Sequence, residues 1–95
     1  MSDGAVARRY SIHGRVQGVG FRWFTRQVAD EIGISGWVKN LPDGTVGAFA
    51  RGTIDQIDRF EARIQEGPPA GRVERLDVED VAPDSGTTGR FEIRH

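Results

Sequence analysis

The segment Gly14-Arg15-Val16-Gln17-Gly18-Val19-Gly20-Phe21-Arg22 decides how the chain folds. Before it, Tyr10 and Ile12 alternate with polar residues, and after it apolar residues recur at helical spacing. These two periods predict a strand, a glycine loop and a helix start. Glycine allows positive φ angles and close approach of a ligand to the backbone, and a helix N-terminus attracts anions. Arg22, in the first helical turn, adds a planar set of donors suited to phosphate or carboxylate.

The same segment does not match the two common nucleotide-binding loops. Trp23 breaks the Gly-x-Gly-x-x-Gly spacing, and no Gly-Lys-Ser/Thr follows. Taken alone, the glycines are explained slightly better by a tight connection, but Arg22 shifts the balance towards an oxyanion cradle, for phosphate. No Ser, Thr, Asp or Asn precedes Phe21, so the first N–H groups of this helix lack a side-chain cap. A bound oxyanion would satisfy them.

Length and composition narrow the class of protein. The 95 residues predict one domain, over 7–95, after a flexible N-terminus at 1–6. A net charge of −1 argues against nucleic-acid binding, which normally shows a basic surface. The absence of cysteine excludes disulfides and thiol catalysis and fits a reducing cytoplasm. Residues 1–6 lack the basic region and apolar core of a secretory signal, and no apolar run reaches the ~20 residues that span a bilayer. We expect a cytoplasmic monomer.

Periodicity, caps and turns predict the other elements. We expect strands over 7–13, 34–41, 45–51 and 72–81, helices over 21–32 and from 53 to the break at 67–69, and a polar loop over 83–89. Phe91 and Ile93 alternate with Glu92 and Arg94, which predicts a short final strand at the C-terminus. The order strand, helix, strand, strand, helix, strand is the split β-α-β pattern of ferredoxin-like folds. It predicts an α+β sandwich in which an antiparallel sheet carries two helices on one face.

Three local signals support that order. Leu41-Pro42-Asp43-Gly44 has the residue types of a tight turn and predicts a hairpin. Thr53 and Gln56 fit a capping box, so the second helix caps itself, unlike the first. Val73 falls out of phase with the rest of the fourth strand, which predicts a bulge.

Asn40 is the second candidate site residue. The first two strands are parallel, because a right-handed crossover joins them, and therefore end at the same edge of the sheet. Asn40 shares a strand face with Val38, which we expect under the helices, so it points across the mouth of the cradle towards Arg22. Such a pair would hold a phosphate and orient a water. Taken alone, Asn40 is explained better by a strand end before the turn. No acidic pair or His/Asp/Glu cluster indicates a metal site or an acid–base pair.

Two segments resemble the signature segments of the acylphosphatase family: 14–22, quoted above, and Gly36-Trp37-Val38-Lys39-Asn40-Leu41-Pro42-Asp43-Gly44-Thr45-Val46. The stretches 67–69 and 72–74 are similar to the family as well, so the resemblance covers nearly the whole chain from Arg9. It implies hydrolysis of the carboxyl–phosphate bond of acyl phosphates to a carboxylate and phosphate, without a metal ion or cofactor.

The resemblance also implies residue roles. Arg22 and the backbone N–H groups of Gln17, Gly18, Val19 and Gly20 bind the phosphoryl group. Asn40 orients the attacking water. Such chemistry asks mainly for positioning and charge stabilisation, because the carboxylate is a good leaving group.

One residue departs from the family pattern. Many members carry an acidic residue where this chain has Gly47. A glycine inside a strand weakens it by roughly 0.5–1 kcal/mol relative to alanine, which concerns local stability and not the cradle.

Two rival functions share this fold. The first is a non-catalytic module that binds RNA or an anionic ligand, but the exposed face of the first strand would carry Arg9, Ser11 and His13, a poor platform for stacking bases. The second is an acylphosphatase-like domain that serves a larger carbamoyl-transfer assembly. We expect it less, because the sequence ends at His95 without a further domain.

Overall fold

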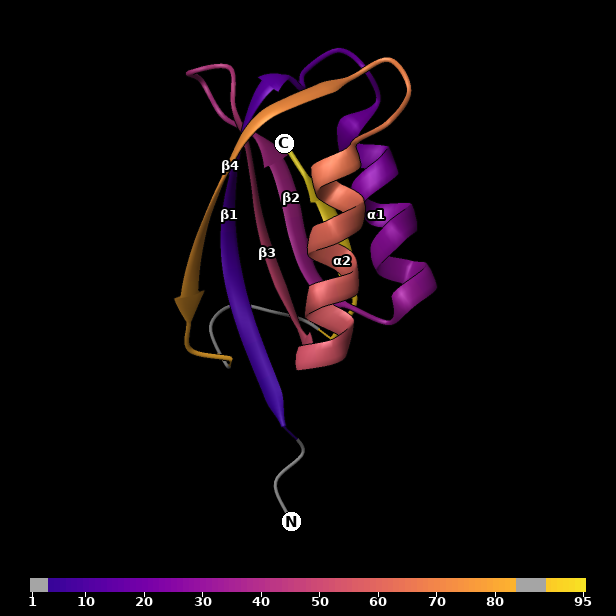
Figure 1. Ribbon diagram of the computed structural model, residues 1–95, viewed down its shortest axis with the longest axis vertical. Helices are drawn as coiled ribbons and strands as arrows, with labels where there is room; N and C mark the ends of the chain where they lie inside the picture. The colour runs from indigo at the N-terminus through magenta and orange to yellow at the C-terminus, as the bar shows by residue number, and fades with distance from the viewer. Residues whose placement is uncertain (1–3, 84–88) are drawn as a thin grey trace.

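The computed structural model describes residues 4–83 and 89–95. Its elements, in chain order, are β1 (Ala5–Arg15), α1 (Phe21–Ile32), β2 (Ser35–Asn40), β3 (Val46–Thr53), α2 (Ile54–Glu66), β4 (Arg72–Val81) and β5 (Phe91–Arg94). The strands form one sheet in the order β4-β1-β3-β2-β5, and both helices lie on one face of it (Figure 1). This is the predicted ferredoxin-like α+β fold.

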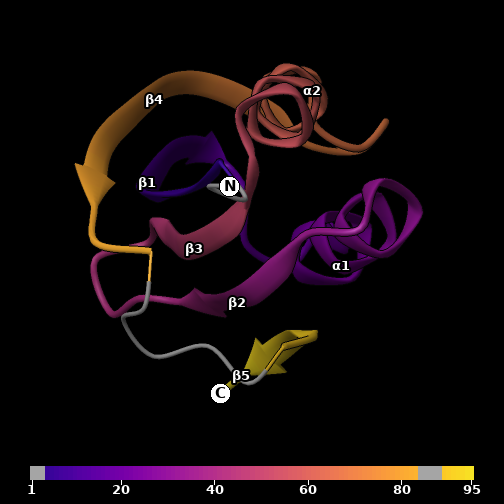
Figure 2. The same ribbon diagram turned by 90° about the horizontal axis from the view of Figure 1, so that it is seen from below.

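Strand directions agree with the prediction except at one edge. β1 is antiparallel to β3 and β4, and β2 is antiparallel to β3. β5 lies beyond β2 and runs parallel to it, so the five-stranded sheet is mixed and not purely antiparallel (Figure 2). The parallel pairing carries the end of β5 to the edge of the sheet where β2 ends.

The bounds of α1 and β4 are those predicted, whereas β1 is longer. Ala5 pairs with Thr53 and Val6 with Gly52, so residues 5 and 6, which we assigned to the flexible terminus, belong to the sheet. Residues 1–3 of that predicted terminus, and 84–88 of the predicted loop, lie outside the described residues. Neither α1 nor α2, the helices of the described part, is long and apolar enough to cross a membrane.

The core lies between the sheet and the two helices. It contains Phe21 and Val28 from α1 and Phe60 from α2, packed on Tyr10 and Val38 of the sheet. All five side chains are at most 2% exposed, as the helical and alternating periods predict.

An aromatic pair packs on the opposite face of the sheet. Trp37 stacks on Phe49 with 6.4 Å between ring centroids, and the Arg94 guanidinium lies 5.2 Å from the Trp37 ring. Trp37 is therefore a packing residue.

The predicted bulge is present and shapes the start of the glycine loop. His13 pairs with Arg75 but Gly14 pairs with Val73, so β4 has one extra residue between them. Gly14 has a φ of 129°, and a Cβ there would collide with the Arg72 carbonyl oxygen. The bulge thus requires a glycine where β1 leads into the loop.

Gly47 accommodates a neighbouring side chain. A Cβ at this position would lie 3.1 Å from Cδ1 of Leu41, so Leu41 occupies the space beside the strand. A larger residue here would require the Leu41 side chain to shift by a few tenths of an ångström.

Candidate active site

The loop over 16–20 ends at an open helix N-terminus. Gly18 and Gly20 have φ angles of 75° and 77°, and a Cβ on either would meet no atom within 4 Å. These positions therefore require glycine for its backbone conformation and not for lack of space. Gly20 is the N-cap of α1 and makes no side-chain cap hydrogen bond, and the first turn has no acidic residue. The predicted absence of a side-chain cap is confirmed.

Gln17 fastens this loop to the hairpin between β2 and β3. Its Nε2 donates to the carbonyl oxygens of Leu41 and Thr45, at 2.9 Å each. The Gln17 side chain is therefore half-buried and engaged with the turn. An amide has two donors and can bond two carbonyls, but which carbonyls face it depends on tertiary packing.

The turn itself is held by Asp43. Its Oδ1 accepts from the Thr45 backbone N–H at 3.0 Å and from the Thr45 hydroxyl at 2.6 Å. These hydrogen bonds, the hydroxyl's first, lower the pKa of the Asp43 carboxyl below its usual value. The turn that carries Gln17's partners is therefore ordered by its own side chains.

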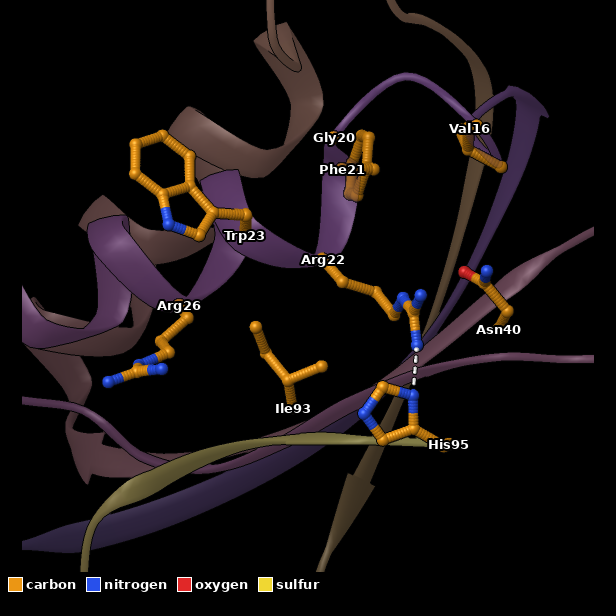
Figure 3. Close-up of a pocket in the computed structure, with 10 residues that line it drawn as sticks. Val16, Gly20, Phe21, Arg22, Trp23, Arg26, Asn40, Ile93 and His95 are labelled. Carbon is orange, nitrogen blue, oxygen red and sulfur yellow. Dashed lines mark hydrogen bonds between the residues drawn. The ribbon is translucent and has the colours of Figure 1, made fainter.

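Asn40 and Arg22 lie in the same cavity, as the parallel-strand argument predicts (Figure 3). Asn40 is the last residue of β2, on the same face as fully buried Val38. The cavity has a volume of about 530 Å³ and is lined by Val16, Gly18, Gly20, Phe21, Arg22, Trp23, Arg26, Asn40, Ile93 and His95.

Four of the predicted site residues line this cavity, and two do not. Gly18, Gly20, Arg22 and Asn40 are among the lining residues. Gln17 and Val19 are not, because the Gln17 side chain bonds the turn and the partly buried Val19 packs against the core. Any role of those two residues in binding rests on the backbone.

Arg22 is held from the end of β5. Its Nη1 donates to the Arg94 carbonyl oxygen and to Nδ1 of His95, at 3.2 Å each. The second contact, drawn in Figure 3, requires the His95 tautomer with an unprotonated Nδ1. The sequence predicts a short C-terminal strand but not its neighbour in the sheet, and for that reason it does not reveal the contact of His95 with Arg22.

The cavity is positively charged. Arg22 and Arg26 both line it, and none of its described lining residues is acidic. Within residues 4–83 and 89–95, no three His, Cys, Asp or Glu side chains gather as metal ligands would. The arrangement suits an anionic ligand.

A family model described as "Acylphosphatase" matches residues 8–93. The chain belongs to the acylphosphatase family. It is 42% identical over 85 residues to an acylphosphatase of Koribacter versatilis, an alignment covering 90% of this chain and 77% of that one. An acylphosphatase of Mannheimia succiniciproducens is 44% identical over 92 residues, covering 95% of this chain and 99% of its own.

Solved structures agree with the family assignment. The Bacillus subtilis acylphosphatase matches with a TM-score of 0.89 and 36% identity, over 95% of this chain and 99% of that one. Full-length HypF in its phosphate- and nucleotide-bound form matches with a TM-score of 0.86 and 30% identity, over 96% of this chain but only 12% of HypF. The same domain thus occurs within a much longer protein.

These comparisons confirm the predicted family, fold and enzyme class. Acylphosphatases are hydrolases that act on acid anhydrides. The family implies a small-molecule acyl phosphate as substrate and phosphate as product.

Proposed function

We propose that the cavity hydrolyses acyl phosphates without a metal ion. In this proposal Arg22 and the backbone N–H groups of residues 17–20 bind the phosphoryl group, and Asn40 orients the attacking water. The observation that carries it is the meeting of Arg22 and Asn40 in one cavity beside a helix N-terminus without a side-chain cap. A phosphoryl group supplies the negative charge that such a helix end favours.

The proposed step is an in-line displacement at phosphorus. The water oxygen bonds to phosphorus while the bond from phosphorus to the acyl oxygen breaks, releasing a carboxylate. A phosphoryl oxygen accepts the proton of the attacking water, so the products are the carboxylate and dihydrogen phosphate. Because the carboxylate is a good leaving group, fixed N–H donors and one guanidinium supply the charge stabilisation that the reaction needs.

The contacts of Arg22 support a fixed orientation of its guanidinium. Both contacts with the end of β5 use Nη1. We assign Nε and Nη2 to the phosphoryl oxygens, which a planar guanidinium binds in bidentate fashion. A donor held in place before the substrate arrives costs little reorganisation during the reaction.

Composition supports the remaining parts of the proposal. The protein acts as a cytoplasmic monomer and does not bind nucleic acid. A chain without cysteine suits a reducing compartment, and a net charge of −1 does not favour a polyanionic partner.

The test is hydrolysis of benzoyl phosphate by the purified protein in EDTA. We expect wild-type activity in EDTA and losses on the order of 10²-fold or more for Arg22→Gln, as for other single oxyanion donors. Asn40→Ala should lose activity through kcat, because water positioning acts in the transition state. Lys39→Gln is the control, since it removes a charge beside Asn40 from a residue that does not line the cavity.

Circular dichroism shows whether the variants are folded. A folded wild-type protein that leaves benzoyl phosphate intact would refute the proposal and favour the anion-binding module.

A further inference from the structure

The cavity is larger than a phosphoryl group requires. It measures about 530 Å³, and a molecule of liquid water takes about 30 Å³, so the phosphoryl group fills only a small part of it. We propose that the part beside Ile93 and Arg26 is an acyl-group subsite that selects acyl phosphates carrying a second anionic group. This inference rests on the proposed function, because it takes the glycine loop, Arg22 and Asn40 as the phosphoryl end.

Two of the side chains that line the cavity, Arg22 and Arg26, follow one another along α1. Arg26 follows Arg22 by four residues, about 6 Å along a helix axis. Figure 3 shows Ile93 between the two arginines, with Arg22 directed towards Asn40 and Arg26 directed the opposite way. Trp23 points away from Ile93 in the same view, and we leave it out of the subsite. A substrate held at Arg22 would therefore extend its acyl chain over Ile93 towards Arg26.

Arg26 is available to a ligand. Its ion pair with Asp30 spans 3.7 Å, and the two side chains are 54% and 58% exposed. Such an exposed pair within one helix contributes little, so a substrate anion can replace Asp30 at small cost. Arg22, by contrast, is bonded to the end of β5 and cannot follow a substrate outward.

Charge favours an anion over a neutral group at this end. The described lining residues include Arg22 and Arg26 but no Asp or Glu. Like charges that line one cavity reinforce each other's field and attract a ligand of opposite sign. A guanidinium pairs best with a carboxylate or phosphate, through two parallel hydrogen bonds.

Ile93 indicates the chemical character of the middle of the ligand. It is a partly buried apolar side chain packed against the core. An aliphatic stretch of the substrate would lie against it without leaving a polar group unpaired. The favoured class is therefore a short aliphatic acyl phosphate that ends in a carboxylate or phosphate.

Two substrates of equal chain length isolate the effect of the terminal negative charge on hydrolysis. Succinyl phosphate ends in a carboxylate, and butyryl phosphate has a methyl group in its place. We expect Arg26→Gln to lower kcat/KM for succinyl phosphate by about 5- to 10-fold at low ionic strength and to lower the value for butyryl phosphate by a clearly smaller factor, because only succinyl phosphate has a carboxylate that pairs with the Arg26 guanidinium. Arg26→Lys should retain part of the preference, because it keeps the charge but loses the planar pair of donors.

Arg59→Gln is the matched control. It removes the same charge from an exposed position on α2 that does not line the cavity, and it should change neither substrate. Equal losses on both substrates, or no loss on succinyl phosphate, would overturn the subsite.

Binding measurements can test this inference independently of the proposed hydrolysis. If the wild type hydrolyses neither substrate, calorimetry with 4-oxo-5-phosphonopentanoate and 2-oxopentylphosphonate, in which CH₂ replaces the scissile oxygen, tests the subsite alone. Weaker binding of only the first compound by Arg26→Gln would support the subsite although hydrolysis had failed. Unchanged binding of both would overturn it.

Discussion

The two helices begin in opposite ways. Thr53 caps α2: its hydroxyl accepts from the Gln56 N–H at 3.2 Å, and the Gln56 side chain accepts from the Thr53 N–H at 2.8 Å. Asp55 adds a negative charge in that first turn. The first turn of α1 has neither a side-chain cap nor an acid and instead carries Arg22, a charge that a helix N-terminus disfavours. The N-terminus of α2 is therefore capped by its own side chains, whereas the N-terminus of α1 suits an anionic ligand.

Arg22→Lys should give the largest effect, because it changes only the open helix end. Lysine keeps the charge but loses the planar donors and cannot make the two contacts of Nη1 in the same geometry. We expect kcat/KM for benzoyl phosphate to fall on the order of 10²-fold, with a free energy of unfolding close to that of the wild type. A loss below tenfold would mean that charge alone suffices at this end.

Gln17→Ala should weaken both stability and the site. It removes two hydrogen bonds to the hairpin, each worth about 0.5–1.5 kcal/mol. Urea unfolding measures the stability, and competitive inhibition by phosphate measures the cradle. Gln27→Ala, on the exposed surface of α1 and outside the cavity, is the control. Lower stability with unchanged phosphate inhibition would show that Gln17 supports the turn without positioning the loop.

Alkaline pH should weaken the attachment of α2 to the sheet. The Tyr10 hydroxyl donates to Glu61 of α2 at 3.2 Å, and burial, followed by the charge of Glu61, raises the pKa of Tyr10 above its usual value. A raised pKa in the folded state contributes stability that is complete below the unfolded pKa of about 10 and is lost as the pH rises through the folded value.

Tyr10 is the only tyrosine, so absorbance at 295 nm follows its ionisation alone. If Tyr10 ionised at the same pH in the folded protein as in the unfolded chain, this prediction would be contradicted. Tyr10→Phe should remove the associated loss of stability.

The contrast between the helix ends was predictable because its causes are local. The capping box at Thr53, the missing cap before Phe21 and the bounds of α1 follow from residues within one or two turns. The meeting of Asn40 with Arg22 required only one further rule, the handedness of the crossover.

The contacts that complete the site depend on distant pairing. β5 could be recognised as a strand, but its place beside β2, and hence the contact of His95 with Arg22, depends on which strand edge is free. The Gln17 amide likewise finds its partners only when the loop and the hairpin come together. Ala5 and Val6 carry no strong strand signal of their own, and they join the sheet because β3 offers Thr53 and Gly52 as partners.

Thr53→Ala should have the smallest effect and tests the contrast directly. Loss of an N-cap hydroxyl costs about 1 kcal/mol, which lowers the melting temperature of a domain of this size by roughly 4–8 °C. Because α2 lines no part of the cavity, kcat/KM for benzoyl phosphate should not change.

Added phosphate should raise the melting temperature of the Thr53→Ala variant as much as that of the wild type, since a ligand stabilises the folded state that it binds. If phosphate no longer stabilises Thr53→Ala, the two helix ends are coupled through the Gln56 amide, which also donates to the Ile32 carbonyl at the end of α1. The separation of a structural end from a ligand-binding end would then fail.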